Sequence, residues 1–248
     1  MDWRTEQVVA FVGRLIPAKG IQAVIAALPL ILRAAPRVRL LVTGHGPLRD
    51  PLEALVVALS QGDRGLAEAV VAHADTIDAG EPEHLEAVRS FWRQLGDAGE
   101  LEAYWAAAGR TVKPDTVLFT GYLTHREMSL LLPCCDAGVF PSMVIESGPL
   151  VFLEALASGV FPIGTYFGGM KVKIDRAAAV LEPRHAQLMK VRPSAQHITA
   201  DIARVVPQAV ALSARYRDAL RQVADEHYDW QPVARRLRQL LLRTAAEA

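Results

Sequence analysis

Cysteine is scarce in this sequence: Cys134 and Cys135 are the only two among 248 residues, and they are neighbours. Adjacent cysteines cannot link distant parts of a fold, and no second thiol pair is available for a zinc site. A disulfide-stabilised scaffold and a cysteine-rich zinc site are therefore excluded. We expect both thiols to be buried as small apolar groups.

Net charge and long apolar runs are also missing. The 27 Lys and Arg residues balance 27 Asp and Glu residues, so no overall positive field would draw the protein to nucleic acid. No apolar run approaches the roughly 20 residues of a membrane span, and the polar start lacks the apolar stretch of a secretory signal. We expect a cytoplasmic protein with no transmembrane segment; a peripheral position at the inner membrane face is left open.

What the sequence does contain is an alternation of short apolar runs and amphipathic helices. Runs rich in Val, Leu and Phe are typical of strands buried on both faces, and their alternation with helices predicts a Rossmann-like, doubly wound parallel α/β sheet. The expected strands are residues 8–12, 38–43, 117–120, 137–140, 161–165 and, as a sixth, 178–181. The helices expected among them are residues 19–33, 124–132 and 149–158.

Two regions depart from this alternation. Residues 60–114 show no strand pattern, and helical patterns at 66–79, 82–95 and 101–108 predict a helical insertion after the second strand. The insertion is either a packed surface element or a lid over a substrate or partner. The chain is again helical over residues 194–246, where we expect an exposed apolar patch that packs on another domain.

Ligands of such sheets bind beyond the carboxyl ends of the strands, and the loops expected there carry charge. Arg14 can clamp phosphate oxygens with its forked guanidinium, and Lys19 adds a point charge. Taken alone, the two are equally compatible with exposed surface cations. Gly148 would let the backbone approach a ligand closely, and the helix that opens at Pro149 would present free N–H groups to an anion.

Two glutamates flank this helix start. Glu154 is the one charged residue of an otherwise apolar helix, which predicts a buried helix and a carboxylate that needs a partner. That partner is either an internal group, such as a backbone amide or an arginine, or a ligand hydroxyl pair such as that of a ribose. Glu146, in the preceding loop, is either solvated or directed at a ligand.

Taken in order, several segments resemble the C-terminal domain of GT-B glycosyltransferases, and more specifically glycosyltransferase family 4 (group 1). The segments are FVGRLIPAKG (11–20), LVTGHGP (41–47), FTGY (119–122), DAGVFPS (136–142), ESGPLVFLE (146–154) and YDWQPVAR (228–235). The fifth matches the E-x7-E motif of the family's retaining members. Together they span nearly the whole chain except the insertion.

The resemblance implies a role for individual residues. Arg14 and Lys19 correspond to the pair on the donor diphosphate, Glu154 to the glutamate on the ribose hydroxyls, and Glu146 to the glutamate near the donor sugar. Further positions correspond to the cleft backbone, the base-binding loop and the helix start that meets phosphate or sugar: Gly13, Gly46, Tyr122, Gly148, Leu150 and Val151. The family commonly has Phe-Gly where this chain has Gly148-Pro149.

These correspondences imply that residues 1–248 form the nucleotide-sugar-binding domain of a retaining glycosyltransferase. The substrate would be a nucleoside-diphosphate sugar, such as a UDP-, GDP- or ADP-sugar, with no cofactor and no metal ion. Such enzymes pair this domain with an acceptor-binding domain that precedes it. We expect that domain to be absent from this chain, as in a fragment or a split enzyme, and the chain alone to be inactive.

Other functions remain open. A non-catalytic nucleotide-sugar-binding or regulatory module would keep the donor site and use the insertion to recruit a partner. A nicotinamide-dependent dehydrogenase is disfavoured because the first expected strand is not followed by a G-x-G-x-x-G loop. A non-hydrolysing sugar-nucleotide epimerase shares the two-domain architecture and is kept as a minor alternative.

Overall fold

A computed structural model of the protein describes residues 2–77 and 85–247. Its centre is a six-stranded sheet in the order β3-β2-β1-β4-β5-β6, in which every neighbouring pair is parallel. The strands are β1 (Gln7–Val12), β2 (Val38–Thr43), β3 (Val117–Gly121), β4 (Ala137–Phe140), β5 (Phe161–Thr165) and β6 (Lys190–Val191). This order is that of the doubly wound Rossmann-like fold, so the predicted fold class is confirmed.

Helices connect consecutive strands of the sheet. Around the centre of the sheet they are α1 (Ile21–Ala34), preceded by a short 3₁₀ turn η1 (Pro17–Lys19), then α6 (His125–Leu131), α7 (Leu150–Ala157), α8 (Gly168–Ala178) and the short α9 (Pro183–Ala186). Thr124 caps α6 and exchanges hydrogen bonds with Glu127, as its spacing predicts. Five of the six expected strands are confirmed to within one residue at each end.

The sixth expected strand is wrong. Residues 178–181 are the end of α8 and the turn after it, and the sixth strand is the two-residue β6. The buried residues Met170, Ile174 and Ala177 continue one helical face up to this point, and alanine strongly favours the helix. A two-residue strand carries no periodicity of its own, so no pattern could have located β6.

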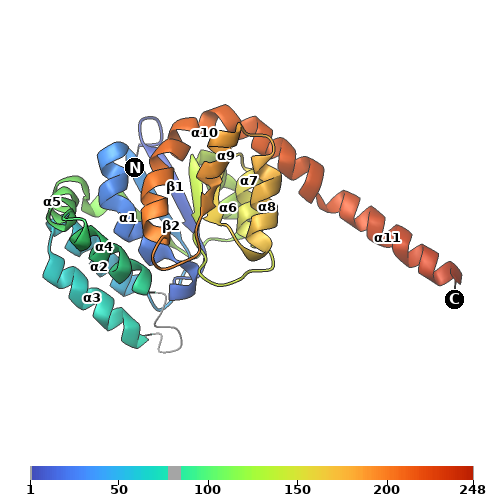
Figure 1. The fold of residues 1–248 in the computed structure, drawn as a ribbon. Coiled ribbons are helices and arrows are strands. Elements are labelled where there is room, and N and C mark those ends of the chain that lie inside the picture. Colours follow the sequence, from blue (N-terminus) through green and yellow to red (C-terminus); the bar gives the residue numbers. More distant parts are fainter. Residues whose placement is uncertain (1, 78–84, 248) are drawn as a thin grey trace.

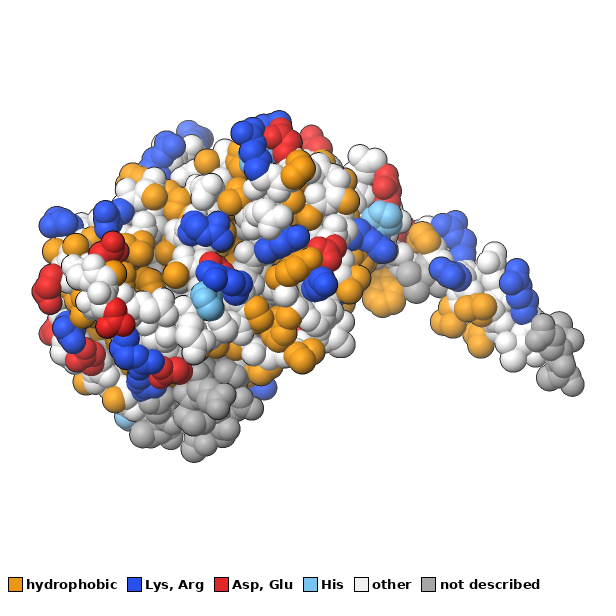
Figure 2. All heavy atoms as spheres, in the orientation of Figure 1, with side chains coloured by type: hydrophobic (Ala, Val, Ile, Leu, Met, Phe, Trp, Pro, Cys, Tyr) orange, Lys and Arg blue, Asp and Glu red, His pale blue; other side chains and the backbone are white. Residues whose placement is uncertain are grey.

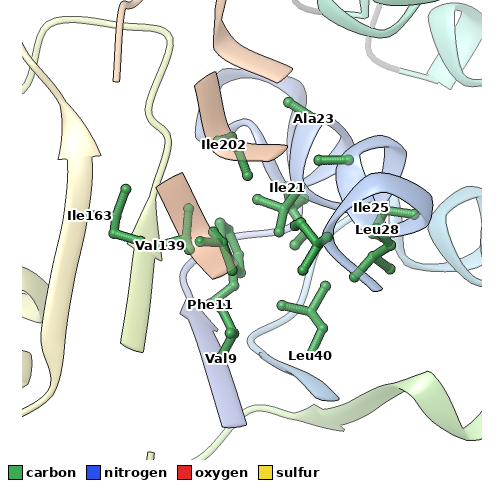
Figure 3. Close-up of a cluster of buried hydrophobic side chains, with 14 of the residues drawn as sticks. Val9, Phe11, Ile21, Ala23, Ile25, Leu28, Leu40, Val139, Ile163 and Ile202 are labelled. Carbon is green, nitrogen blue, oxygen red and sulfur yellow. The ribbon is translucent and has the colours of Figure 1, made fainter. Parts of the chain in front are cut away.

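A large part of the core lies between the sheet and α1, whose buried residues are almost all apolar. Figure 3 shows Val9, Phe11 and Leu40 from the strands beside Ile21 and Ile25 of α1. Four consecutive residues of β1, from Val8 to Phe11, are at most 2% exposed, as expected of a strand covered on both faces. The long helix α10 (Ile198–Tyr228) packs on α1 and α7 and closes the core on one side.

Four helices lie between β2 and β3: α2 (Arg49–Gln61), α3 (Arg64–Ile77), α4 (Glu86–Asp97) and α5 (Leu101–Thr111). Aromatic residues join α4 and α5 to α1: the hydroxyl of Tyr104 donates to the carbonyl of Ala26 in α1 (2.8 Å) and accepts from Trp92 Nε1 (3.3 Å). The first helix was not predicted. Residues 78–79 and 82–84, at the ends of two expected helices, lie outside the described residues.

The last helix, α11 (Trp230–Glu247), projects from the body (Figure 1). Hydrophobic and basic side chains both lie on its surface (Figure 2), and its large apolar side chains are exposed, including Trp230, Leu237, Leu240 and Leu241. The expected exposed apolar patch is therefore present. Among the described residues, no helix combines the length and apolar character needed to cross a membrane.

The cysteines only partly follow the expectation. Cys135 is buried, and burial raises the pKa of its thiol to about 12. Cys134, the last residue of the short 3₁₀ turn η4 (Leu132–Cys134), is exposed. The prediction that both thiols are buried is therefore wrong for Cys134.

Candidate functional site: a cleft at the carboxyl ends of β1 and β4

The strand order changes direction between β1 and β4, and a cleft of about 290 Å³ opens at this point. It lies beyond the carboxyl ends of the two strands, where doubly wound sheets bind their ligands. Its walls come from the loop after β1, the loop after β4, and the start of α7. Of the residues predicted for the site, five line the cleft: Gly13, Lys19, Glu146, Leu150 and Val151.

The loops after β1, β2 and β3 are joined by backbone hydrogen bonds. The N–H of Leu15 donates to the carbonyl of His45 (2.9 Å), and the N–H of Gly44 donates to the carbonyl of Gly121 (2.8 Å). Gly44 has φ 141°, and a Cβ there would lie 1.8 Å from the carbonyl oxygen of Gly13. The glycine is therefore needed for the loops to meet at the cleft edge.

Lys19 and Glu146 form an ion pair inside the cleft. The loops that carry them are clasped together, because the N–H of Met143 donates to the carbonyl of Ala18 (2.8 Å). The two side chains are 31% and 17% exposed, so the pair is shielded yet open to a ligand. The structure thus brings together two residues 127 positions apart that were predicted to share one site.

The start of α7 supplies the second anion-binding element. Its N-cap residue, Pro149, has no side chain that could accept from the first N–H groups of the helix. Pro149, Leu150 and Val151 all line the cleft, and Leu150 is 59% exposed. The positive end of the helix dipole therefore faces the same space as the Lys19 ammonium.

A second lysine lies behind the Glu146 loop and was not predicted. Lys173 belongs to α8, whose first turn is fixed to the loop by a hydrogen bond from the N–H of Gly169 to the carbonyl of Glu146 (2.8 Å). Burial lowers the pKa of Lys173, and the charge of Glu146 opposes that shift. The Gly-Gly pair followed by two lysines was the available signal in the sequence.

Glu154 lies on the other side of α7, in a separate hollow of about 460 Å³ that shares only Leu150 with the cleft. Its carboxylate is 32% exposed and lies 3.4 Å from the imidazole Nδ1 of His125. The prediction of a buried helix with a buried carboxylate is therefore wrong. Only Phe152, Ala155 and Leu156 are buried in α7, because one face packs on the core and the others line the two hollows.

The remaining predicted residues lie at the edge of the site. Arg14 follows Gly13 in the cleft wall, is exposed, and forms no hydrogen bond or ion pair with the described part of the chain. Gly46 packs behind the cleft against the backbone of Leu15. Tyr122 is 68% exposed, with its ring edge against His45 (6.0 Å between centroids). Gly148 lies against Lys173.

The family is decided by the extent of a single match. The family model described as "Glycosyl transferases group 1" matches residues 3–64 and 96–222, which is most of the chain. The chain belongs to this family. The match covers every strand of the sheet and both walls of the cleft.

This group 1 glycosyltransferase domain resembles several solved structures. The Anabaena protein HepE, in complex with UDP and glucose, is 17% identical with a TM-score of 0.54, over 97% of this chain and 49% of that chain. The C-terminal domain of a glycosyl transferase group 1 family protein from Francisella tularensis is 18% identical with a TM-score of 0.53, over 90% and 86% respectively. These likenesses identify the fold as that of a GT-B domain.

One curated relative shares a short segment. A D-inositol 3-phosphate glycosyltransferase from Segniliparus rotundus is 58% identical over 41 residues, which is 16% of this chain and 9% of that protein. The group 1 domain described here thus spans a small part of this relative and about half of HepE. Residues 65–95, which the family model leaves unmatched, comprise most of α3 and α4.

Proposed function

We propose that this chain is the donor-binding half of a retaining glycosyltransferase of family 4, which transfers a sugar from a nucleoside-diphosphate sugar. The observation that carries the proposal is the Lys19–Glu146 pair at the β1–β4 switch point, beside the uncapped start of α7. A cation, a helix N-terminus and a carboxylate in one cleft suit a ligand that has both phosphates and hydroxyls.

In this proposal the diphosphate lies between Lys19, Arg14 and the first N–H groups of α7. These groups would stabilise the negative charge that develops on the diphosphate as it leaves the sugar, without a metal ion or a cofactor. Glu146 would accept hydrogen bonds from the donor sugar. Glu154, across Leu150, would accept them from the ribose hydroxyls, for which its partial exposure is suited.

UDP-sugars are the first donors to test, because HepE was solved with UDP and glucose. The acceptor-binding half would lie outside these 248 residues, since the chain spans 49% of HepE and 86% of the Francisella C-terminal domain. The exposed apolar side chains of α11 would pack on that half. Without it, we expect donor binding but little sugar transfer. A cytoplasmic location belongs to the same proposal.

Calorimetric titration of the chain with UDP, GDP and ADP tests the donor site. We expect one nucleotide to bind, and both Arg14→Ala and Glu154→Ala to weaken that binding. Arg33→Ala is the matched control, because Arg33 is an exposed arginine in the last turn of α1, at the opposite end of the sheet. A folded protein that binds none of the three nucleotides contradicts the proposal.

A further inference from the structure

Glu146 has two lysines near it, from different elements. Lys19 approaches from the loop after β1 and forms the ion pair, whereas Lys173 approaches from α8 and interacts with the same carboxylate through its charge. Lys173 forms no hydrogen bond or ion pair with the residues that the structure describes. A partly buried ammonium therefore lies at Gly148, two residues from a carboxylate that is already paired with another lysine.

Gly148 makes this approach possible. A Cβ at position 148 would lie 2.8 Å from Nζ and 3.1 Å from Cε of Lys173, so any side chain there would displace the ammonium. The N–H of Gly169 fixes the start of α8 to the carbonyl of Glu146, which sets the distance between the helix and the loop. The helix that carries Lys173 is thus fixed to the loop that carries Glu146.

The arrangement bears on what happens when a diphosphate enters. While it binds phosphate oxygens, Lys19 would share its three N–H donors between them and Glu146, which weakens its pairing with the carboxylate. A Glu146 carboxylate left without a partner would also repel the incoming phosphates at short range. A second cation beside Glu146 removes both difficulties.

We infer that Lys173 is a positioning residue. When the donor binds, it pairs with the Glu146 carboxylate, so that Lys19 can bind the donor diphosphate. This inference rests on the proposed function. It gives the two lysines different tasks: Lys19 touches the ligand, and Lys173 acts only through Glu146. Removal of Lys173 would leave Lys19 tied to Glu146, so ligand binding would have to break that ion pair.

A double-mutant cycle on nucleotide affinity tests the inference with the chain as it exists. The probe is UDP, or whichever of GDP and ADP binds the wild-type chain, and the readout is Kd by calorimetry. We expect Lys173→Met to raise Kd by about five- to tenfold, as the loss of one partner of a coupled charge pair does, and to have less than about a twofold effect in the Glu146→Gln background. Lys173→Arg should restore the affinity.

The control is Lys171→Met, on the same helix, where the lysine lies over the ring of Tyr166 (5.5 Å) and should not affect Kd. Lys173→Gln replaces Lys173→Met if the latter does not fold. An equal loss of affinity in both Glu146 backgrounds would show that Lys173 touches the ligand, and no loss in either would show that it has no role; both overturn the inference. A wild-type chain that binds no nucleotide contradicts the proposed function itself.

Discussion

Glu146 and Glu154 lie on opposite sides of α7 in different surroundings. Glu146 is 17% exposed and ion-paired with Lys19, with Lys173 close behind the loop. Glu154 is 32% exposed, and its neighbour is the imidazole Nδ1 of His125 at 3.4 Å. The Glu146 carboxylate is therefore paired with a cation that a phosphate would also attract, whereas the Glu154 carboxylate is more exposed and has no lysine or arginine partner among the described residues.

The largest effect on nucleotide affinity should follow from the loss of Lys19, the cation that pairs with Glu146. Lys19→Ala removes the charge-assisted contact between the lysine ammonium and the phosphate oxygens. We expect nucleoside diphosphate affinity to fall roughly 30-fold or more. Titration of inorganic pyrophosphate should show a similar loss. A Lys19→Ala variant that binds either ligand with wild-type affinity would contradict the proposal that the cleft binds the diphosphate.

A smaller effect, of about tenfold, is expected on the other side of α7. Glu154→Ala removes an acceptor for ribose hydroxyls, so nucleoside diphosphate binding should weaken by about one or two charged hydrogen bonds. Pyrophosphate, which has no ribose, should bind this variant as it binds the wild type. Equal losses for both ligands would mean that Glu154 does not distinguish ribose from phosphate.

The smallest effect is one in which substitutions of the two carboxylates change nucleoside diphosphate affinity in opposite directions. Glu146→Gln keeps the shape of the side chain but frees Lys19, so nucleoside diphosphate affinity should rise by about two- to fivefold. Glu154→Gln should instead lower it. Titration of both variants beside the wild type measures this difference. Shifts of Kd in the same direction would contradict the different roles of the two carboxylates.

The sequence predicts the surroundings of Glu146 better than those of Glu154. Lys19 and Glu146 each follow an apolar strand, and the carboxyl ends of parallel strands share an edge, so their proximity followed from the fold class. The exposure of Glu154 did not follow, because an apolar pattern does not distinguish a helix face on the core from one that lines a hollow. Leu150 and Val151 show this, since both are apolar and both line the cleft.

Lys173 shows a different limit. Nothing in its own spacing links it to Glu146, from which it is separated by α7 and β5. Its proximity depends on how α8 is fixed to the loop through Gly169, and on the absence of a side chain at Gly148. Such contacts arise from the docking of whole elements, which periodicity in the sequence does not specify.

A crystal structure of the chain with its tightest-binding nucleoside diphosphate would test the central claim most directly. The account predicts the diphosphate against Lys19 and the first N–H groups of α7, the ribose hydroxyls within hydrogen-bond distance of Glu154, and Glu146 turned from Lys19 toward Lys173. A nucleotide bound away from the β1–β4 cleft, or one in the cleft with its ribose remote from Glu154, would contradict it.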